Sequence, residues 1–407
     1  MPPKSAAAEN LWLPGDRVAD VRPVSVTTAR TSLGTSTLPG LAFATRLYEI
    51  QDAYLRPFGV LHMPVPNHHT IVLESPVPDQ SPVDVTQAAS WIARWVRTIA
   101  LLSGIPDLIG AGLTMDLAMG DDGTRTPMPV LPASGIRERL AAAWAGAQSP
   151  TPRRPAVISV RIALTFGSAV RGGRFTRGPD TTTTSHLGRR LPGLSASLKI
   201  AGDEPAAPLS GADVAEAIRV AYDPSIAGYV NRYAPERRGT SPSWDDACPT
   251  VSVDDWDHYQ HETACSVTWS SAKRSGVAEL PELVAEVLRP DGALLRKRIT
   301  LLYKQPDHGK YSAADQRVDR AKLAMHGLLV TATANDRHAL AAADRMLQEL
   351  RVSSRLSIRR VFGAQASGFA ASLPLGILAP EHLSPPQSAR TPTGRRRRRR
   401  RGSAASV

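Results

Sequence analysis

Residues 256–259 are the densest group of chemically active side chains in the sequence: Trp256, Asp257, His258 and Tyr259. An Asp–His pair is able to transfer protons in general acid–base catalysis. Consecutive residues of a strand point to opposite faces, however, and no nucleophile accompanies this pair. We therefore favour a structural interpretation, in which Trp256 and Tyr259 anchor a long loop while Asp257 and His258 form hydrogen bonds. An enzyme with an Asp257/His258 site is the alternative.

A second group has the ligand types of a tetrahedral zinc site: Cys248, His258, His261 and Cys265. Neither the cysteine pair nor the histidine pair has the spacing usual in zinc sites, so we interpret them as two thiols and two loop histidines. The adjacent His68 and His69 are interpreted as polar residues at a hairpin turn. We predict no catalytic residue, no metal ligand and no cofactor.

Seven consecutive arginines stand near the C-terminus: Arg395, Arg396, Arg397, Arg398, Arg399, Arg400 and Arg401. Mutual repulsion and hydration keep such a run extended, and its natural ligands are the phosphates of DNA or anionic lipids. Binding of this kind depends steeply on salt and carries no base specificity. A tail that only promotes solubility is the alternative.

Motifs of nucleotide and hydrolase chemistry are missing from the sequence. It has no Gly-x-x-x-x-Gly-Lys-Ser/Thr loop, no Gly-x-Ser-x-Gly elbow and no His-Glu-x-x-His pair. The glycine-containing stretch 167–173 lacks both the lysine and a following helix pattern. Nucleotide hydrolysis by this chain alone is therefore not expected.

Length and charge allow a multidomain chain with local basicity. The 407 residues suffice for two or three domains. The net charge is +12, and because the arginine run supplies seven of these charges, about +5 belongs to the rest. Two cysteines are too few for a disulfide framework. The longest apolar stretch, Thr98–Thr114, is interrupted by Pro106 and Asp107. We expect a soluble, cytoplasmic chain without a secretory leader.

The elements that would position these residues follow from periodicity and capping signals. A hairpin is predicted over Phe58–His62 and His69–Glu74, and Asp84 and Ser210 are predicted to cap helices that run to Ser103 and Tyr222. Other predicted strands are Leu108–Met119, Val157–Phe166, Leu194–Ile200, Cys265–Ser270, Arg298–Tyr303, Gly327–Ala332 and Leu356–Val361. Other predicted helices are Gly135–Ala147, Leu280–Leu288, Tyr311–Met325 and Arg337–Leu350.

This succession predicts an α+β fold of two or three αβ sandwich modules with mixed sheets and disordered termini. The expected division is an extended N-terminal arm (1–45), an N-terminal α+β domain (46–225), a linking loop region (226–262), a C-terminal α/β domain of ferredoxin-like units (263–378) and a disordered Arg-rich tail (379–407).

The order of several short motifs resembles a known family. They are Val60-Leu61-His62 with Thr70–Glu74, the helix bearing Trp91 and Trp95, Val220–Pro224, Trp256–Tyr259, and Val361-Phe362-Gly363 leading to Ser372–Gly376. This series, from about residue 55 to 378, resembles the soluble region of an actinobacterial membrane-protein family encoded with conjugative elements. That family is described as PrgI-like and is similar to the EccE component of type VII secretion.

The resemblance implies a non-enzymatic component that works beside a transport ATPase at the membrane. Family members begin with two transmembrane helices, which residues 1–56 lack, and the arginine run is a candidate substitute for that anchor. Cys265 also stands where the family pattern favours an aromatic residue.

The sequence is therefore compatible with three functions. The first is a structural component of a conjugative DNA-transfer or secretion machine, docking a transport ATPase or membrane subunits at the inner face of the plasma membrane. The second is a nucleic-acid-binding accessory protein that uses the arginine tail together with the basic stretch Arg171–Arg190. The third is the enzyme with an Asp257/His258 site.

Overall fold

The computed structural model describes residues 30–105, 107–119, 156–167, 181–227, 243–271, 277–305, 325–353, 357–378 and 382–385. Three predictions fall on other parts of the chain. The helix Gly135–Ala147, the helix Tyr311–Met325 apart from its last residue, and the arginine run all lie outside the described residues.

Within the described residues, 13 strands form one sheet in the order β1-β2-β3-β4-β6-β5-β11-β12-β10-β9-β8, with β7 paired to β4 and β13 paired to β10. The strands of the first half are β1 Thr31–Ser36, β2 Thr45–Gln51, β3 Pro57–Met63, β4 His68–Ser75, β5 Leu108–Met119, β6 Ala156–Gly167 and β7 Ala207–Pro208. Those of the second half are β8 Ser252–Asp254, β9 Tyr259–His261, β10 Ala264–Ser271, β11 Arg296–Lys304, β12 Met325–Ala334 and β13 Ile358–Arg360.

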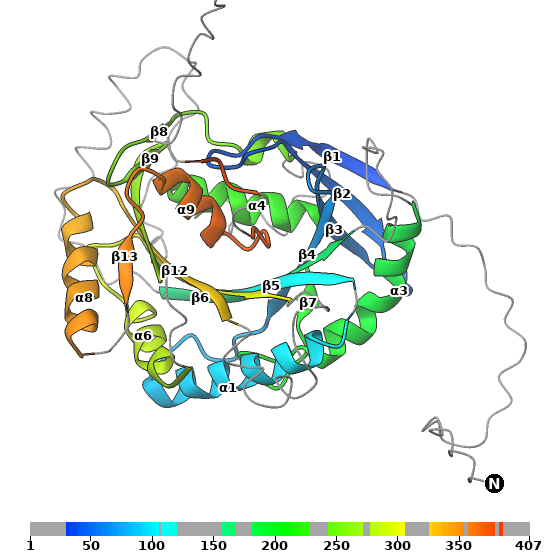
Figure 1. Cartoon of the computed structure of the whole chain (residues 1–407), viewed down its shortest axis with the longest axis horizontal. Helices are drawn as coiled ribbons and strands as arrows, with labels where there is room; N and C mark the ends of the chain where they lie inside the picture. The colour runs from blue at the N-terminus through cyan, green and yellow to red at the C-terminus, as the bar shows by residue number, and fades with distance from the viewer. Residues whose placement is uncertain are drawn as a thin grey trace, which may run out of the picture.

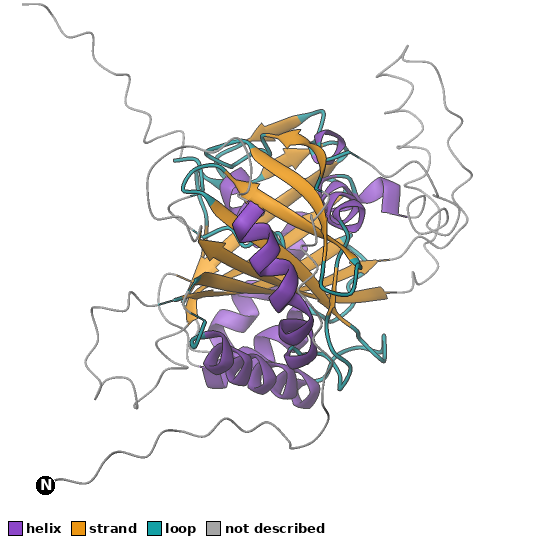
Figure 2. Ribbon diagram, turned by 90° about the vertical axis from the view of Figure 1, so that its right-hand side faces the viewer, coloured by secondary structure: helices purple, strands orange, loops and turns teal. Residues whose placement is uncertain are grey.

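Six α-helices in the described residues cover the two faces of this sheet: α1 Val85–Leu102, α3 Thr181–Ser197, α4 Gly211–Tyr222, α6 Leu280–Val287, α8 Leu340–Ser353 and α9 Gln365–Ser372. The sheet curves around α4 and α9, while α1, α3, α6 and α8 lie on its outer side (Figure 1). The side view shows the strands wrapping the inner helices above the outer helical layer (Figure 2). The predicted α+β class is confirmed.

Two apolar cores result, one on each face of the sheet. The outer core joins α1 and α6 to the sheet through side chains such as Trp95, Leu283 and Ile162. The inner core joins α4 and α9 to the opposite face through Ile218, Phe369 and other buried side chains. Strand residues alternate between the faces, and β4, β11 and β12 supply both cores. The apolar residues of β5 and β6 belong to the outer core, while the intervening positions include the polar residues Thr114, Asp116 and Arg161.

The two halves of the sheet follow the same path. β4-α1-β5-β6-α3-β7, called here the first unit, and β10-α6-β11-β12-α8-β13, the second unit, are both β-α-β-β-α-β. The first strand of each unit pairs with the fourth and the third, and the third pairs with the second, which is the ferredoxin-like order. β5 and β11 join the units, and α1 packs against α6 across the joint.

Matching side-chain contacts recur in the two units. Thr70 and Thr165 approach at 3.0 Å between the first and third strands of the first unit. Thr268 and Thr331 do the same at 3.0 Å in the second unit. Each unit is also followed by an inner helix, α4 or α9, and preceded by a hairpin, β2–β3 or β8–β9, that extends the sheet. The chain is therefore built from two similarly connected halves.

Two predicted helix N-caps and the predicted hairpin are confirmed. Asp84 accepts the Gln87 backbone N–H at 2.7 Å at the start of α1. Ser210 and Asp213 form a reciprocal capping box at the start of α4. The predicted hairpin is also present, with Met63 and His68 as the last pair before its turn. Local sequence signals were sufficient here because each cap or turn is completed within a few residues.

Other predictions are wrong. The described strands form one continuous sheet, and every described strand pair is antiparallel, so the predicted mixed sheets are absent from this part of the chain. The predicted strand Leu194–Ile200 belongs largely to α3, where Leu187 and Leu191 are buried one helical turn apart. In a short stretch, alternation and helical spacing are easily confused.

Three segments predicted to be loops or termini belong to the fold. The predicted arm 1–45 contains β1, and Leu38 and Leu41 of that arm are buried. The predicted linker 226–262 contains β8 and β9. The predicted tail 379–407 includes residues 382–385, and its Leu383 bridges to Leu41. These short pieces gain their order from contacts distant in sequence, which composition does not reveal.

None of the helices in the described part of the chain combines the length and the apolar character needed to cross a membrane.

Candidate functional site

The predicted tetrapeptide Trp256–Tyr259 lies at the edge of the sheet, in and before β9. Tyr259 is 1% exposed and belongs to the inner core, whereas Trp256 is 62% exposed. The Trp256 ring stacks on the half-exposed Phe362 ring with 6.1 Å between their centroids. Gly363 lies against the same indole, and its N–H donates to the Trp256 carbonyl at 2.7 Å. Trp256 therefore holds the loop against Phe362 and Gly363 at the surface, whereas Tyr259 enters the inner core.

Asp257 and His258 do form a hydrogen bond, with 2.9 Å between Oδ1 and Nδ1. Asp257 also accepts from Arg337 at 2.8 Å, and His258 Nε2 lies 3.4 Å from Asp255. The hydrogen bond from His258, together with the Arg337 charge, lowers the pKa of Asp257. The carboxylates of Asp255 and Asp257 and the imidazole of His258 are thus all paired with neighbouring side chains. Neither Asp257 nor His258 lines the two cavities described below.

The proposed zinc ligands do not come together. Cys265 belongs to the outer core, whereas Cys248 packs against the inner core. His261, which lies opposite Ala264 across the β9–β10 turn, points to the inner side and accepts from Ser266. The described residues contain no group of three His, Cys, Asp or Glu side chains that could hold a metal ion.

His261 instead belongs to a buried polar chain. Its Nδ1 lies 2.5 Å from the Tyr222 carbonyl, which fixes the proton on that nitrogen. Its Nε2 accepts from Ser266 Oγ at 2.7 Å, and Ser266 lies 2.7 Å from Thr333 Oγ1. Burial lowers the pKa of His261 to about 4. A neutral His–Ser pair resembles a hydrolase dyad in geometry, but both residues are fully buried.

A buried charge cluster lies at the joint of the two units. Arg296 Nε donates to Asp116 Oδ1 at 2.9 Å, and Arg298 Nη2 donates to Asp116 Oδ2 at 3.3 Å. Arg296 Nη1 also donates to the Val220 carbonyl at 3.1 Å, and Arg298 Nη1 donates to Ser372 Oγ at 3.2 Å. Burial alone would raise the pKa of Asp116, but the two guanidinium groups outweigh it and lower the pKa. This cluster fixes β5, β11, α4 and α9 to one another.

His68 and His69 are the first two residues of β4, directly after the hairpin turn, and both side chains are buried. His69 stacks on His62 with 4.8 Å between ring centroids, and neither of its nitrogens has a hydrogen-bond partner in the described chain. His68 Nδ1 lies 2.9 Å from Nε2 of His382. Burial, with smaller effects of His62 and His68, lowers the pKa of His69 to about 3.

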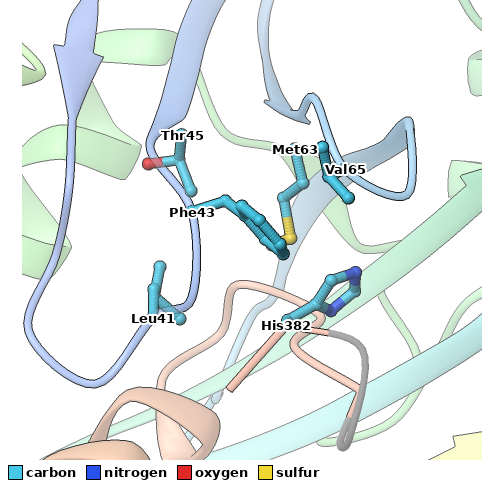
Figure 3. Close-up of a pocket in the computed structure, with 6 residues that line it drawn as sticks. All are labelled: Leu41, Phe43, Thr45, Met63, Val65 and His382. Atoms are coloured by element: carbon cyan, nitrogen blue, oxygen red, sulfur yellow. The ribbon is translucent and has the colours of Figure 1, made fainter. Parts of the chain in front are cut away.

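A small cavity lies beside His382 (Figure 3). Figure 3 shows Phe43 and Met63 side by side, with His382 on the far side of the space. Its volume is about 10 Å³, which is room for roughly one water molecule. Apart from His382 and Thr45 the surrounding side chains are apolar, and a space of this size is a packing defect and not a ligand site.

A larger cavity of about 240 Å³ lies at the N-terminus of α9. Its walls come from residues 39–40, from β8 and β9, from the first turn of α9 and from residues 384–385. Asp254 of β8 accepts the Ala366 N–H at 2.9 Å there. Tyr259 also lines the space, and its buried hydroxyl makes no hydrogen bond of good geometry within the described part of the chain. Of the two cavities, this one is polar and large enough to hold a side chain.

Sequence reasoning singled out Tyr259 but missed its cavity partner Asp254. It also missed the Asp116 cluster, although Asp116, Arg296 and Arg298 are charged residues inside otherwise apolar strand patterns, and that signal was available. Asp254 gave no such signal, because it lies in an exposed-looking acidic run, and only the contact with α9 gives it a role.

The chain was also compared with known proteins. No protein-family model matches it, and none of the curated proteins searched matches it either.

Proposed function

We propose that this chain is a non-enzymatic structural component of a conjugative DNA-transfer or secretion machine, which docks a transport ATPase or membrane subunits. The order of motifs in the sequence motivates the proposal. In support, motifs far apart in sequence meet in the inner core: Tyr222 and Tyr259 pack edge to face at 6.4 Å, and Leu375 is fully buried nearby. The motifs are then parts of one scaffold.

The observation that carries the docking role is an exposed apolar surface at the β8 edge of the sheet. It consists of Val251, Val253, Trp256 and Phe362, and is called here the β8-edge surface. Their exposed fractions are 54%, 46%, 62% and 52%. Aromatic rings stacked in water are typical of protein–protein contact surfaces, because burying them against a partner releases apolar area.

Charged groups border the β8-edge surface. Asp257 pairs with Arg337 at 2.8 Å, and Arg360 pairs with Asp344 at 2.6 Å while lying 5.9 Å from the Phe362 ring. An apolar centre with a polar rim is the usual anatomy of a protein interface. The partner in this proposal is therefore a protein subunit, bound through an apolar anchor and oriented by the rim charges.

In this proposal the two units have a structural role and the arginine run has a membrane role. The first and second units act as two αβ modules fused through β5 and β11. The chain lies at the inner face of the plasma membrane, with Arg395–Arg401 attracted to anionic lipid. Each basic residue near such a surface contributes roughly 1 kcal/mol.

Co-purification with the transport ATPase or membrane subunits encoded beside this chain tests the docking role. We expect capture by the parent chain at low salt and loss of capture when Trp256 and Phe362 are both replaced by Ala. Tyr54→Ala, which removes another aromatic ring that is 71% exposed, is the matched control and should leave capture unchanged. Repeated failure of the parent chain to capture either partner, or equal capture by the double variant, contradicts the proposal.

A nucleic-acid-binding accessory protein is the second candidate, and the seven consecutive arginines favour it. A chain that ends at Pro386 should then lose most of its salt-sensitive DNA binding, because phosphate neutralisation by arginine releases counterions. Unchanged DNA binding by that truncated chain excludes the tail as the DNA-binding element.

A further inference from the structure

In the described part of the chain, the second half of the sheet lacks a strand that the first half has. β2 and β8 hold equivalent places, because each is the outer strand of a hairpin, β2–β3 or β8–β9, that extends its unit. In the first half, β1 pairs along β2 over Thr31–Ser36. The outer edge of β1 is contacted in turn, since the Leu33 carbonyl accepts the Trp244 N–H at 2.7 Å. In the second half, β8 is the last strand of the described sheet.

The backbone of β8 alternates between its partner strand and its open edge. Val251 accepts a backbone hydrogen bond from one end of the β9 segment at 2.9 Å, and Asp255 donates one to the other end at 3.0 Å. The hydrogen-bonded positions of this ladder are therefore Val251, Val253 and Asp255. The N–H and C=O groups of Ser252 and Asp254 point away from β9, and no described backbone group pairs with them.

The nearest segments of the chain leave this edge unpaired. Gly40 accepts the Ser384 N–H at 2.9 Å, and the carbonyls of Gly40 and Ser384 lie 3.1 and 3.0 Å from Ser367 Oγ of α9. These two segments thus bond to each other and to α9, not to β8. Ser252 and Val253 are exposed, so an added segment can reach the edge of β8 from solvent.

Apolar side chains lie on one side of this edge. Val251 and Val253 are 54% and 46% exposed, and they point to the same face because alternate residues of a strand share a face. The stacked rings of Trp256 and Phe362 belong to the same β8-edge surface. A strand added beside β8 would cover both valines if every second residue of that strand were apolar.

The edge is also acidic. Residues 243–271 contain six carboxylates and no lysine or arginine. Arginines from other segments pair with Asp257 at 2.8 Å and with Glu262 at 2.9 Å. The other four carboxylates have no lysine or arginine partner in the described part of the chain, and the Asp255 side chain among them is 50% exposed. A basic segment is therefore complementary to this edge, whereas an acidic segment is not.

From this geometry we propose that β8 accepts an extended segment of a protein partner as an additional strand, in the place that β1 holds beside β2. The segment carries basic residues and has apolar residues at alternate positions. Its backbone pairs with Ser252 and Asp254, and its apolar residues cover Val251 and Val253. The inference rests on the docking role proposed above and specifies how the partner binds.

Amide hydrogen exchange of the full chain, measured residue by residue, tests whether the edge is open. We expect the N–H groups of Ser252 and Asp254 to exchange quickly and the N–H of Val253, which faces β9, to exchange slowly. Protection of Ser252 and Asp254 that does not depend on concentration means that a segment of the same chain covers β8. Protection that grows with concentration means that a second copy covers it. Either result overturns the proposal.

A synthetic peptide of alternating basic and valine residues, acetyl-Lys-Val-Arg-Val-Lys-Val-Arg amide, is the probe for the occupant. The control peptide has the same composition, with the basic and apolar residues grouped in two blocks. Fluorescence anisotropy of the labelled peptides should give the alternating one at least about tenfold higher affinity for the full chain, and its binding should protect the Ser252 and Asp254 amides. Equal affinity for the two peptides, or binding without protection, overturns the proposal.

Ser252→Pro removes only the outward N–H, because residue 252 does not donate to β9. It should lower the affinity for the alternating peptide about three- to tenfold, as expected for one lost hydrogen bond. The matched variant Ser252→Ala keeps the N–H and should bind as tightly as the parent chain. Equal affinity of a folded Ser252→Pro variant and the parent overturns the proposal. If urea unfolding shows that this variant does not fold, the protection experiment with the peptide decides.

The outcomes separate this inference from the docking role. A transport ATPase or membrane subunit that the chain captures, but that leaves the Ser252 and Asp254 amides unprotected, docks through side chains alone. That result overturns strand addition and leaves the docking role in place. Binding of the alternating peptide without capture of either partner supports the open edge and contradicts the docking role.

Discussion

The edge of the first half of the sheet is covered, whereas the edge of the second half is short and bears exposed apolar groups. In the first half, β1 pairs along β2, and the segment around Asp245 adds a further contact, since Asp245 accepts the Thr35 N–H at 2.9 Å. In the second half the last strand, β8, has three residues, and Val253 and the nearby Trp256 face solvent. Two halves with the same path thus differ at their edges while their centres are alike.

The features that the two halves share hold the fold together, whereas the features that differ are candidates for function. The shared features, such as the threonine pairs and the carboxylates at the inner helices, lie where the sheet and helices must be held together. The features found in one half only, the β8-edge surface and the α9 cavity, lie at the β8 end of the sheet. Differences are tolerated at the edges of the sheet because few core contacts depend on them.

Removal of Asp116 is expected to have the largest effect, because it breaks the joint between the halves. Asp116→Ala leaves Arg296 and Arg298 buried, each without its carboxylate partner. Loss of one member of a buried ion cluster costs about 3–5 kcal/mol. Urea unfolding measures the change. Asp203→Ala, which removes a carboxylate that is 96% exposed, is the control and should have almost no effect. A similarly small effect of Asp116→Ala would show that the joint does not need its charges.

Acid should destabilise the chain in part through His69 of the first half. Its pKa is about 3 in the folded chain and about 6.5 when unfolded, so the unfolded chain binds the proton first as pH falls. Stability is then lost from about pH 6.5 downwards, by up to about 1.4 kcal/mol per pH unit for one group, until the folded-state pKa is reached. His69→Phe should reduce this loss between pH 6.5 and pH 4, measured by urea unfolding at each pH.

The control for this experiment is His338→Phe, which replaces an exposed histidine and should leave the acid dependence unchanged. His261 of the second half, with a pKa of about 4, contributes in the same direction and remains in both variants. An unchanged acid dependence in His69→Phe would mean that His69 is not held neutral by the fold.

Removing the carboxylates at the helix N-termini should have an effect of intermediate size on stability. α4 begins with the Ser210–Asp213 capping box in addition to Glu49, whereas the N-cap of α9, Ala364, makes no side-chain hydrogen bond. Asp254 therefore has a larger share in stabilising α9 than Glu49 has in stabilising α4. We expect Asp254→Ala to cost about 1–2 kcal/mol and Glu49→Ala about half of that. Thermal unfolding compares them, and equal losses would mean that the capping box does not substitute for Glu49.

Sequence reasoning succeeded where a signal was local. The strand Leu108–Met119 was predicted with its observed bounds, and the caps at Asp84 and Ser210 were correct, because each is specified by neighbouring residues. It failed for α9, whose residues are all buried and, apart from Gln365 and Phe369, small, so that no polar face reveals the helical period. The pairing of β5 with β11 was equally hidden, since Thr114 and Thr300, which lie opposite each other, are 186 residues apart.

The same limit applies to the candidate site. The tetrapeptide at Trp256 drew attention because of its residue types, yet the cavity depends on Asp254, which meets Ala366 across 112 residues of sequence. Tyr259 belonged to the predicted group, but its role in lining the space could not be inferred without the position of α9. Residue type indicates possible chemistry, while long-range strand order decides which residues share a site.

The threonine pairs give the smallest expected effect and the most direct comparison of the two units. Thr70→Val removes one partner of Thr165, but Thr165 Oγ1 also donates to the Gly376 carbonyl at 3.0 Å and stays satisfied. Thr268→Val removes the hydroxyl that lies 3.0 Å from Thr331 Oγ1. Because valine has nearly the shape of threonine, packing is preserved and the difference reports the hydrogen bond. We expect about 0.5 kcal/mol for Thr70→Val and about 1 kcal/mol for Thr268→Val in urea unfolding. The reverse order would mean that the Gly376 contact does not compensate, and that the first unit depends on its threonine pair more than the second does.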